Sequence, residues 1–407
     1  MLKQLACNMT GLKEYSEGRT TFLTADVEEH TAEKGQPTTD MPVFYNPRMR
    51  INRDLSVLFL RAYMEKNDMK LFCEPLAGSG VRSLRYLNEI PGEFNGLLCD
   101  VNPMAIETAT KNLDKHGFLD RAQVLHGDAK ILLLTESRGK RFDFVDIDPF
   151  GSPVPYLNAA IQSLNPRGGL LGLTATDMPA LCGVYPRVAL RKYGGLSTRA
   201  PFTHELAVRL LLGRTYSIAA MNGCSIKPLG ILSTDHYIRA WIHIESNKTE
   251  SNKQVDSIGM IRLCRSCQHA EVYSLRQSGS SEFLHEQENC PADTAIAGPL
   301  WIGDLYDSKT LERTVKLHEL DPEAYHKRVR ELLELMTEEQ TLVRFPFMDI
   351  HDVCDAYNLP SPKRSDITDV LIAKGYQVSR THFRPTAIRT DAPVREVVSI
   401  IKDLIGE

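Results

Sequence analysis

The chain has 407 residues, enough for two or three domains of ordinary size. Its hydrophobic fraction of 42% and charged fraction of 25% are typical of globular proteins and exclude a collagen-like, coiled-coil or mostly disordered chain. The 52 acidic and 48 basic side chains give a net charge of −4, so a nucleic-acid site would have to be a local basic patch.

No run of the sequence approaches the ~18 uninterrupted apolar residues of a membrane-spanning helix. The N-terminal residues lack the long apolar core and cleavage site of a secretory signal. Nine cysteines are too few for a disulfide scaffold. We therefore expect a cytoplasmic protein with no membrane partner, and no obligate protein partner is evident.

Helices and strands are expected to alternate from about residue 54 onward. The first forty residues are polar and acid-rich and predict a mobile or loosely packed leader. Asp54 is expected to cap the first helix. Short apolar strands are predicted at 71–73, 96–99, 124–125, 142–147 and 169–174. Repeated strand–helix units predict a doubly wound, Rossmann-like α/β sheet, whose ligands bind beyond the carboxyl ends of the strands.

The composition changes near residue 247, and we expect three parts. Residues 1–247 form the α/β domain, 248–310 a short-stranded segment, and 311–407 a smaller α+β C-terminal domain. In the last part Ser365 is expected to cap a helix that Gly375 ends, and a final helix follows Pro393.

A glycine loop follows the first predicted strand of the sheet. Glu74 precedes Gly78 and Gly80, and glycines here let the backbone approach a ligand closely. Dinucleotide dehydrogenases and class I S-adenosyl-L-methionine (SAM) methyltransferases share this pattern, and a plain strand–helix turn is also compatible with it. Arg82 and Ser83 follow where a dehydrogenase favours a further glycine, and Glu74 can bind the cationic head of SAM.

Further acids follow the next two predicted strands. Asp100 lies twenty positions after Gly80, where an acid can accept both ribose hydroxyls in either class of enzyme. Asp128 and Ala129 stand where methyltransferases hold the adenine amino group, although Asp128 could simply cap a turn. Three acids at three successive strand ends favour SAM.

The segment Asp148-Pro149-Phe150 is the most informative about the reaction. Methyltransferases that act on exocyclic base amines have a similar order of acid, proline and aromatic residue. A carboxylate and a backbone carbonyl that accept the two N–H groups favour a pyramidal, nucleophilic nitrogen. We predict Asp148 as hydrogen-bond and proton acceptor, the Pro149 carbonyl as second acceptor, and Phe150 as a stacking surface for a base taken out of its helix. The alternative is a proline turn in which Asp148 caps the next helix.

Longer motifs resemble the tRNA (guanine(26)-N2)-dimethyltransferase family. They lie at residues 44–49, 52–54, 148–153, 174–177, 298–301, 379–385 and 390–393, nearly the whole chain. The resemblance implies a SAM-dependent enzyme that methylates, and usually dimethylates, N2 of guanine 26 in tRNA. It implies Asp148 as the catalytic aspartate. The SAM contacts that it implies are Arg53, Arg82, Asp100, Asp128 and Ala129. The helix–strand–basic-loop pattern near the C-terminus predicts that 311–407 is a tRNA-docking domain.

Two basic clusters offset the acidic total locally. The first contains Arg187, Arg191, Lys192, Arg199, Arg209 and Arg214, and the second contains Lys374, Arg380, Arg384, Arg389 and Arg395 with His382 and Phe383 between them. Both are candidates for phosphate contacts and stacking, with a solvated charged face as the alternative.

Three cysteines have metal-like spacing. Cys264 and Cys267 resemble half of a zinc site, and Cys290 could begin the second half. Related sequences are expected to complete it with a second Cys-x-x-Cys, but here that position is Asp293. A structural zinc ion or a relict site is expected. The candidates for a fourth ligand are Asp293, His285 and His269.

Three other functions remain open. A methyltransferase acting on adenine N6 or a protein glutamine would favour two prolines and a tyrosine after the acid. A catalytically silent RNA-binding protein could keep the same fold, although Glu74, Asp100, Asp128 and Asp148 argue against it. A nicotinamide-dependent dehydrogenase is the third alternative.

Overall fold

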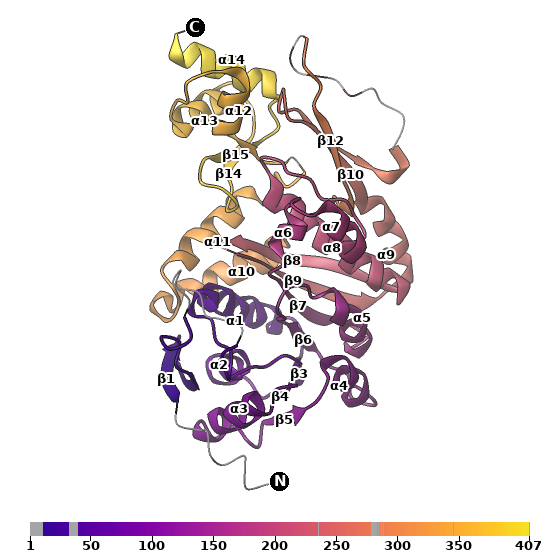
Figure 1. Cartoon of the computed structure of the whole chain (residues 1–407), viewed down its shortest axis with the longest axis vertical. Coiled ribbons are helices and arrows are strands. Elements are labelled where there is room, and N and C mark those ends of the chain that lie inside the picture. The colour runs from indigo at the N-terminus through magenta and orange to yellow at the C-terminus, as the bar shows by residue number, and fades with distance from the viewer. Residues whose placement is uncertain are drawn as a thin grey trace. The chain divides into compact units, whose positions relative to one another are not determined.

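The computed structural model describes residues 11–31, 40–234, 236–277, 283, 285, 287, 289–344 and 346–406 (Figure 1). The chain divides into two compact units. Unit 1 comprises residues 1–149, 158–173 and 313–331, and unit 2 comprises 150–157, 174–312 and 332–407. Within the described ranges, no helix has the length and apolar character needed to cross a membrane.

Unit 1 is built on parallel strands in the order β5-β4-β3-β6-β7. Their bounds are β3 (Leu71–Glu74), β4 (Asn95–Asp100), β5 (Ala122–His126), β6 (Phe144–Ile147) and β7 (Gly169–Ala175), whose last two residues belong to unit 2. Every residue of β6 and β7 is buried, as expected for strands covered on both faces. The antiparallel pair β9-β8 follows β7 in the strand order. The predicted α/β, Rossmann-like class is confirmed.

Helices cover both sides of the parallel strands. In Figure 1, α2 and α3 lie on one side of β3 and β4, and α4 lies on the other. Pro103 occupies the first turn of α3, and the Asn102 side chain accepts a hydrogen bond from the Met104 N–H. The helices with residues in unit 1 are α1 (Arg50–Met64), α2 (Val81–Glu89), α3 (Pro103–Lys115), α4 (Ala129–Glu136), α5 (Val154–Ser163), α10 (Ser308–Glu319) and α11 (Arg328–Glu339).

The prediction that Asp54 caps the first helix is wrong. Helix α1 begins at Arg50, so Asp54 lies inside it and is buried. The Asp54 carboxylate accepts a hydrogen bond from Arg85 at 2.6 Å. A buried guanidinium needs a counter-charge, and this long-range pairing, rather than capping, explains the acid.

The prediction of a loosely packed leader is wrong for the described part of that segment. β1 (Leu12–Glu17) and β2 (Thr20–Ala25) pair as an antiparallel hairpin. Phe22 is buried, with its ring centroid 5.0 Å from that of Tyr45. Residues 1–10 and 32–39 of the predicted leader lie outside the described residues.

The first part of unit 2 contains helices, the antiparallel pair that extends the large sheet, and a separate three-stranded antiparallel sheet. The helices are α6 (Met178–Leu181), α7 (Pro186–Tyr193), α8 (Thr203–Met221) and α9 (Lys248–Lys253). The strands are β8 (Cys224–Thr234), β9 (Tyr237–Ser246), β10 (Ile258–Cys264), β11 (Ala270–Ser274) and β12 (Thr294–Trp301). β10 lies between β11 and β12 in a three-stranded sheet. The division at 247 and 310 stays a prediction.

The C-terminal part of unit 2 has its own apolar core, which includes Ile367, Leu371, Val397 and Ile401. Its elements are β13 (Met348–Asp349), α12 (Ile350–Tyr357), α13 (Arg364–Ala373), β14 (Val378–Arg380), β15 (Ala387–Thr390) and α14 (Val394–Ile405). Ser365 does not cap α13, because the helix begins at Arg364, one residue earlier.

Candidate functional site

Four carboxylates follow four neighbouring strands of unit 1. Asp128 comes after β5, Asp100 ends β4, Glu74 ends β3, and Asp148 comes after β6. Because the strands are parallel, their carboxyl ends share one edge of the sheet. The structure therefore groups these predicted site residues along one edge.

Arg82 of α2 pairs with the predicted catalytic acid. Its Nη2 donates to the Asp148 carboxylate. Its Nη1 donates to Asn52 Oδ1 at 2.9 Å and to Ser56 Oγ at 3.2 Å. Arg82 is buried, whereas Asp148 is partly exposed. Two polar groups of α1 thus hold the guanidinium that holds Asp148.

Two further carboxylates lie close to the same guanidinium. Arg82 Nε is 3.8 Å from Glu74 Oε1 and 3.7 Å from Asp146 Oδ2. Asp146 also accepts a hydrogen bond from the Tyr86 hydroxyl at 2.6 Å. Burial raises the pKa of Glu74 to about 8, although the nearby Arg82 acts in the opposite direction. One cation is therefore shared among three acids.

Asp100 organises the glycine loop. Its Oδ2 accepts a hydrogen bond from the Gly78 N–H at 2.8 Å, and its Oδ1 accepts one from the Asn102 N–H at 2.9 Å. Gly80 has φ +75°, and a Cβ there would lie 3.1 Å from the Cβ of Ala109. The loop thus requires glycine for both its conformation and its packing.

Asp128 caps α4, which is the alternative that the sequence left open. Its Oδ1 accepts hydrogen bonds from the N–H groups of Lys130 at 2.9 Å and Ile131 at 3.2 Å. Ala129, the first residue of the helix, is buried. Capping fixes Asp128 at the strand end, and its contact with adenine stays a prediction.

Two exposed apolar side chains beside these acids were not predicted. Val101, next to Asp100, is 69% exposed, and Ile131, three residues after Asp128, is 63% exposed. A flat apolar ring such as adenine could cover such side chains. For Val101 the signal in the sequence was an apolar residue at a loop position where a polar one is usual, whereas Ile131 lies within α4.

Arg53 is buried, and its guanidinium contacts other residues of the chain. Its Nε donates to Glu17 Oε2 at 2.7 Å, and its Nη2 donates to the Asn46 carbonyl at 2.9 Å. The guanidinium carbon lies 5.1 Å from the centroid of the Tyr45 ring. The contact between Arg53 and SAM that the resemblance implies stays a prediction.

Asp148 is not placed to cap the following helix, because its carboxylate pairs with Arg82 and α5 begins only at Val154. Pro149, the next residue, is buried. Phe150, which belongs to unit 2, is 61% exposed. An exposed phenylalanine suits a stacking surface.

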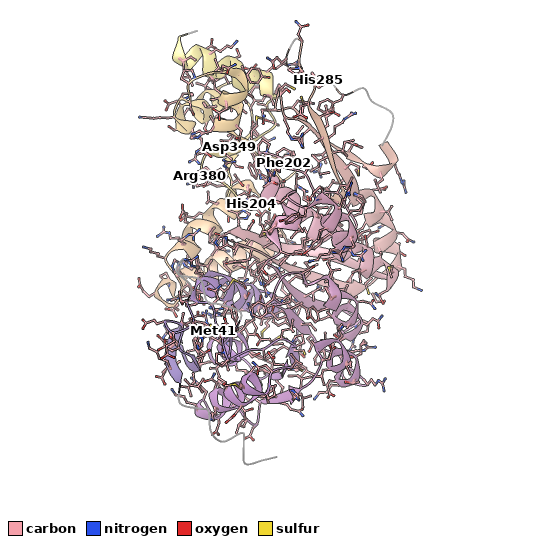
Figure 2. The ribbon with its side chains drawn as sticks, viewed as in Figure 1. Met41, Phe202, His204, His285, Asp349 and Arg380 are labelled. Carbon is pink, nitrogen blue, oxygen red and sulfur yellow. The ribbon has the colours of Figure 1, made fainter. Side chains whose placement is uncertain are left out.

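The cysteine cluster in unit 2 contains a fourth candidate ligand. The ligand atoms of Cys264, Cys267, His285 and Cys290 all lie within 4.8 Å of one another. Cys264 Sγ is 3.5 Å from Cys290 Sγ, and Cys267 Sγ is 3.7 Å from His285 Nδ1. Figure 2 labels His285 near the ends of β10 and β12. Neighbouring ligands of a tetrahedral zinc ion are separated by ~3.5–3.8 Å, so these residues fit the ion.

The other two candidates for the fourth ligand have different partners. Asp293 Oδ1 lies 3.0 Å from Arg265 Nη1. His269 Nε2 lies 3.4 Å from Glu271 Oε1. Of the three residues considered, the structure places only His285 with the cysteines.

The basic clusters are only partly available to a ligand. Arg209 and Arg389 are buried, and both pair with Glu205, at 2.8 and 2.9 Å respectively. The prediction that these two arginines contact phosphate is therefore wrong. Arg380 is exposed but pairs with Glu338.

Comparison with known proteins gives consistent matches over most of the chain. A family model described as "N2,N2-dimethylguanosine tRNA methyltransferase" matches residues 18–402. The tRNA (guanine(26)-N(2))-dimethyltransferase of Methanosphaera stadtmanae is 35% identical over 366 residues, 89% of this chain and 91% of that protein. The protein of the same name from Methanococcus maripaludis strain C7 is 34% identical over 396 residues, 96% and 98% of the two chains.

A solved structure is similar over nearly the full length. It is described as a complex of Trm1 from Pyrococcus horikoshii with S-adenosyl-L-methionine. The TM-score is 0.78 at 29% sequence identity, and the match covers 96% of this chain and 99% of that one. The similarity extends across both units.

Proposed function

The chain belongs to the N2,N2-dimethylguanosine tRNA methyltransferase family, and we propose that it methylates the N2 amine of guanine 26 in tRNA with SAM as methyl donor. The observation that carries the assignment of the reaction site is the partly exposed Asp148 carboxylate at the end of β6, held by the buried Arg82. It lies on the sheet edge that also holds Glu74 and Asp100. A cytoplasmic location stays a prediction.

The edge of the sheet offers groups that fit each part of SAM. In this proposal Glu74 would bind the cationic methionine head and Asp100 would accept the ribose hydroxyls, beside the loop that contains Gly78 and Gly80. Val101 and Ile131 would cover the adenine ring. The donor supplies a methyl group activated by its sulfonium charge.

Asp148 is the residue that prepares the acceptor amine. Its carboxylate would accept one N–H of N2 while the Pro149 carbonyl accepts the other, which directs the nitrogen lone pair away from the ring. The proton lost from N2 passes to Asp148. A monomethylated N2 still has one hydrogen, so the same carboxylate can orient it for a second transfer. Phe150 would stack on the extruded base.

Transfer from labelled SAM to unmodified tRNA transcripts with guanine or adenine at position 26 tests this function. Nucleoside analysis should detect dimethylguanosine only with the guanine transcript, and the product should be absent with Asp148→Ala. The control is SAM affinity, which this variant should keep. Transfer to neither transcript, with SAM still bound, would move the search to other amine substrates.

We also propose that Cys264, Cys267, His285 and Cys290 hold one structural zinc ion. The four ligand atoms are close enough for tetrahedral coordination, and three thiolates with one imidazole are a donor set that zinc favours. The ion would connect the end of β10 to the segment that precedes β12.

Metal analysis of purified protein tests the zinc site. We expect about one zinc per chain, lost with His285→Ala and retained with the matched controls His269→Ala and Asp293→Ala. Cobalt substitution should give thiolate-to-metal absorption. Retention of zinc by His285→Ala with loss in Asp293→Ala would assign the fourth ligand to Asp293 instead.

A further inference from the structure

Helix α7 of unit 2 is attached to the loop that carries Phe150. The Gly151 N–H donates to Thr176 Oγ1 at 2.8 Å, and the Thr176 N–H donates to the Gly151 carbonyl at 2.9 Å. The hydroxyl of Tyr193, at the end of α7, donates to Asp177 and also has a hydrogen bond with Ser152. Two adjacent loop residues are thus fixed to the end of β7 and to α7.

A buried tyrosine and an ion pair hold the C-terminal end of α7. Tyr193 is buried, and its neighbour Lys192 lies 3.1 Å from Asp177 Oδ2. Burial and the adjacent Asp177 raise the pKa of the Tyr193 hydroxyl above its usual range, which keeps it a hydrogen-bond donor. The Tyr185 N–H, just before α7, donates to the Pro179 carbonyl of α6 at 3.2 Å. Both ends of α7 are therefore held.

The outer face of α7 combines exposed apolar and cationic side chains. Tyr185 is 57% exposed, and Arg187, Leu190 and Arg191 are also exposed. The last three are spaced i, i+3 and i+4, so they share one face of the helix. The segment Pro186–Tyr193 contains no acid. Within the described parts of the chain, the side chains of Arg187 and Arg191 form no hydrogen bond or ion pair.

This pattern contrasts with three other arginines of the two basic clusters. Arg209, Arg380 and Arg389 all pair with glutamates. Two unpaired guanidinium groups beside an exposed tyrosine, on a chain with net charge −4, are suited to a polyanion that also presents aromatic rings.

We propose that this surface, formed by Tyr185, Arg187 and Arg191, binds the tRNA strand next to the target nucleotide. Tyr185 stacks on a neighbouring base, and the two arginines contact its phosphates. The hydrogen bonds of Gly151 and Ser152 fix the position of this surface relative to Phe150, on which the target base is proposed to stack. The inference rests on the proposed function, because it takes tRNA as the substrate.

Equilibrium binding of the unmodified guanine-26 transcript to the full chain tests the proposal. Arg187→Ala/Arg191→Ala should weaken binding about tenfold or more. It should also reduce the slope of log Kd against log salt concentration by about one to two. Tyr185→Ala should weaken binding at least about fivefold, and Tyr185→Phe should restore it. SAM affinity should stay unchanged in all of these variants.

Arg138→Ala/Arg167→Ala is the matched control. Both arginines are exposed, and they precede β6 and β7, at the opposite ends of the strands from the acids. Their removal should leave tRNA affinity and its salt dependence close to those of the unaltered protein. Equal losses in both double variants would overturn the proposal, since only general charge would then matter.

The outcomes separate this inference from the proposed function. Unchanged tRNA affinity in Arg187→Ala/Arg191→Ala, alongside normal methylation of guanine 26, would overturn the role of α7 alone. Absence of methylation by the unaltered protein would overturn the function, while the binding assay would still test α7. If an alanine variant also lost SAM affinity, Arg187→Gln/Arg191→Gln would repeat the test with longer neutral side chains.

Discussion

Two buried charge clusters in this chain differ in how well their charges are balanced. In unit 1, Glu74, Asp146 and Asp148 share Arg82. In unit 2, two glutamates meet two arginines. The pairs are Glu205 with Arg209 and Arg389, and Glu339 with Arg389, at 2.8 to 2.9 Å.

Further hydrogen bonds to Glu339 also stabilise the second cluster. Glu339 accepts hydrogen bonds from Tyr306 at 2.8 Å, Thr381 at 2.6 Å and His382. Burial opposes the ionisation of Glu339, but His382 and Arg389 outweigh it and hold its pKa well below the usual range. A charge-balanced cluster stabilises a fold, whereas a cluster with excess negative charge and one partly exposed carboxylate is suited to a ligand.

The largest expected effect is on catalysis in unit 1. Asp148→Ala should lower the rate of methyl transfer by about 10²- to 10⁴-fold, because an oriented proton acceptor is lost. Single-turnover assays with saturating SAM and tRNA measure it. The unfolding free energy should change little, since Asp148 is partly exposed. A variant that unfolds more easily but transfers at the normal rate would make Asp148 a structural residue.

The next effect is on stability in unit 2. Glu339→Gln should lower the unfolding free energy by about 3–5 kcal/mol, because it breaks a buried ion pair. Glu338→Gln is the matched control at the neighbouring position. Glu338 pairs with the exposed Arg380, so its loss should cost at most about 1 kcal/mol. Urea unfolding measures both, and similar losses would contradict the contrast between the two glutamates.

A smaller effect is expected in the pH dependence of stability. The folded state keeps a proton on Glu74 up to a pKa of about 8, whereas the ordinary value is 4.5. Since the unfolded chain has lost that proton, the unfolding free energy should fall as pH rises through this window, by at most about 1.4 kcal/mol per pH unit.

Comparison with Glu74→Gln isolates this contribution. Burial lowers the pKa of His204 and His243, which acts in the opposite direction near neutral pH in both proteins. The difference between the two unfolding curves, measured in urea across the window, therefore reports Glu74. Parallel curves would show that Glu74 is ionised throughout.

The smallest effect concerns the predicted adenine contact. Val101→Ala should weaken SAM binding by about three- to tenfold, because less apolar surface would be covered by the ring. Calorimetric titration measures the affinity. Leu119→Ala is the control, since Leu119 is also exposed but does not follow a strand-end acid.

Local patterns in the sequence predicted the sheet and the acids at its edge. The strand Phe144–Ile147 is short and mostly apolar, and Asp148 follows it directly in the sequence. Asn102 could be assigned as a cap because its partner lies two residues away.

The failed prediction for Ser365 missed a helix start by one residue, whereas others depended on partners far away in the sequence. Asp54 lies inside a helix and pairs with Arg85, and the buried Arg389 pairs with Glu205 and Glu339. A run of basic residues in the sequence does not show whether their charges face solvent or pair with acids elsewhere in the fold. For the same reason, His285 could be named only as one of several candidate ligands.

The carboxylate of Glu339 determines what truncation of the C-terminal segment would do to the rest of unit 2. Its partners come from residues 306, 381, 382 and 389, and Arg389 also reaches Glu205 of α8. A chain truncated before β14 would leave this buried anion with only the Tyr306 hydroxyl among these partners. The C-terminal segment is therefore not a removable appendage. Its unfolding should be cooperative with that of α8 and α11.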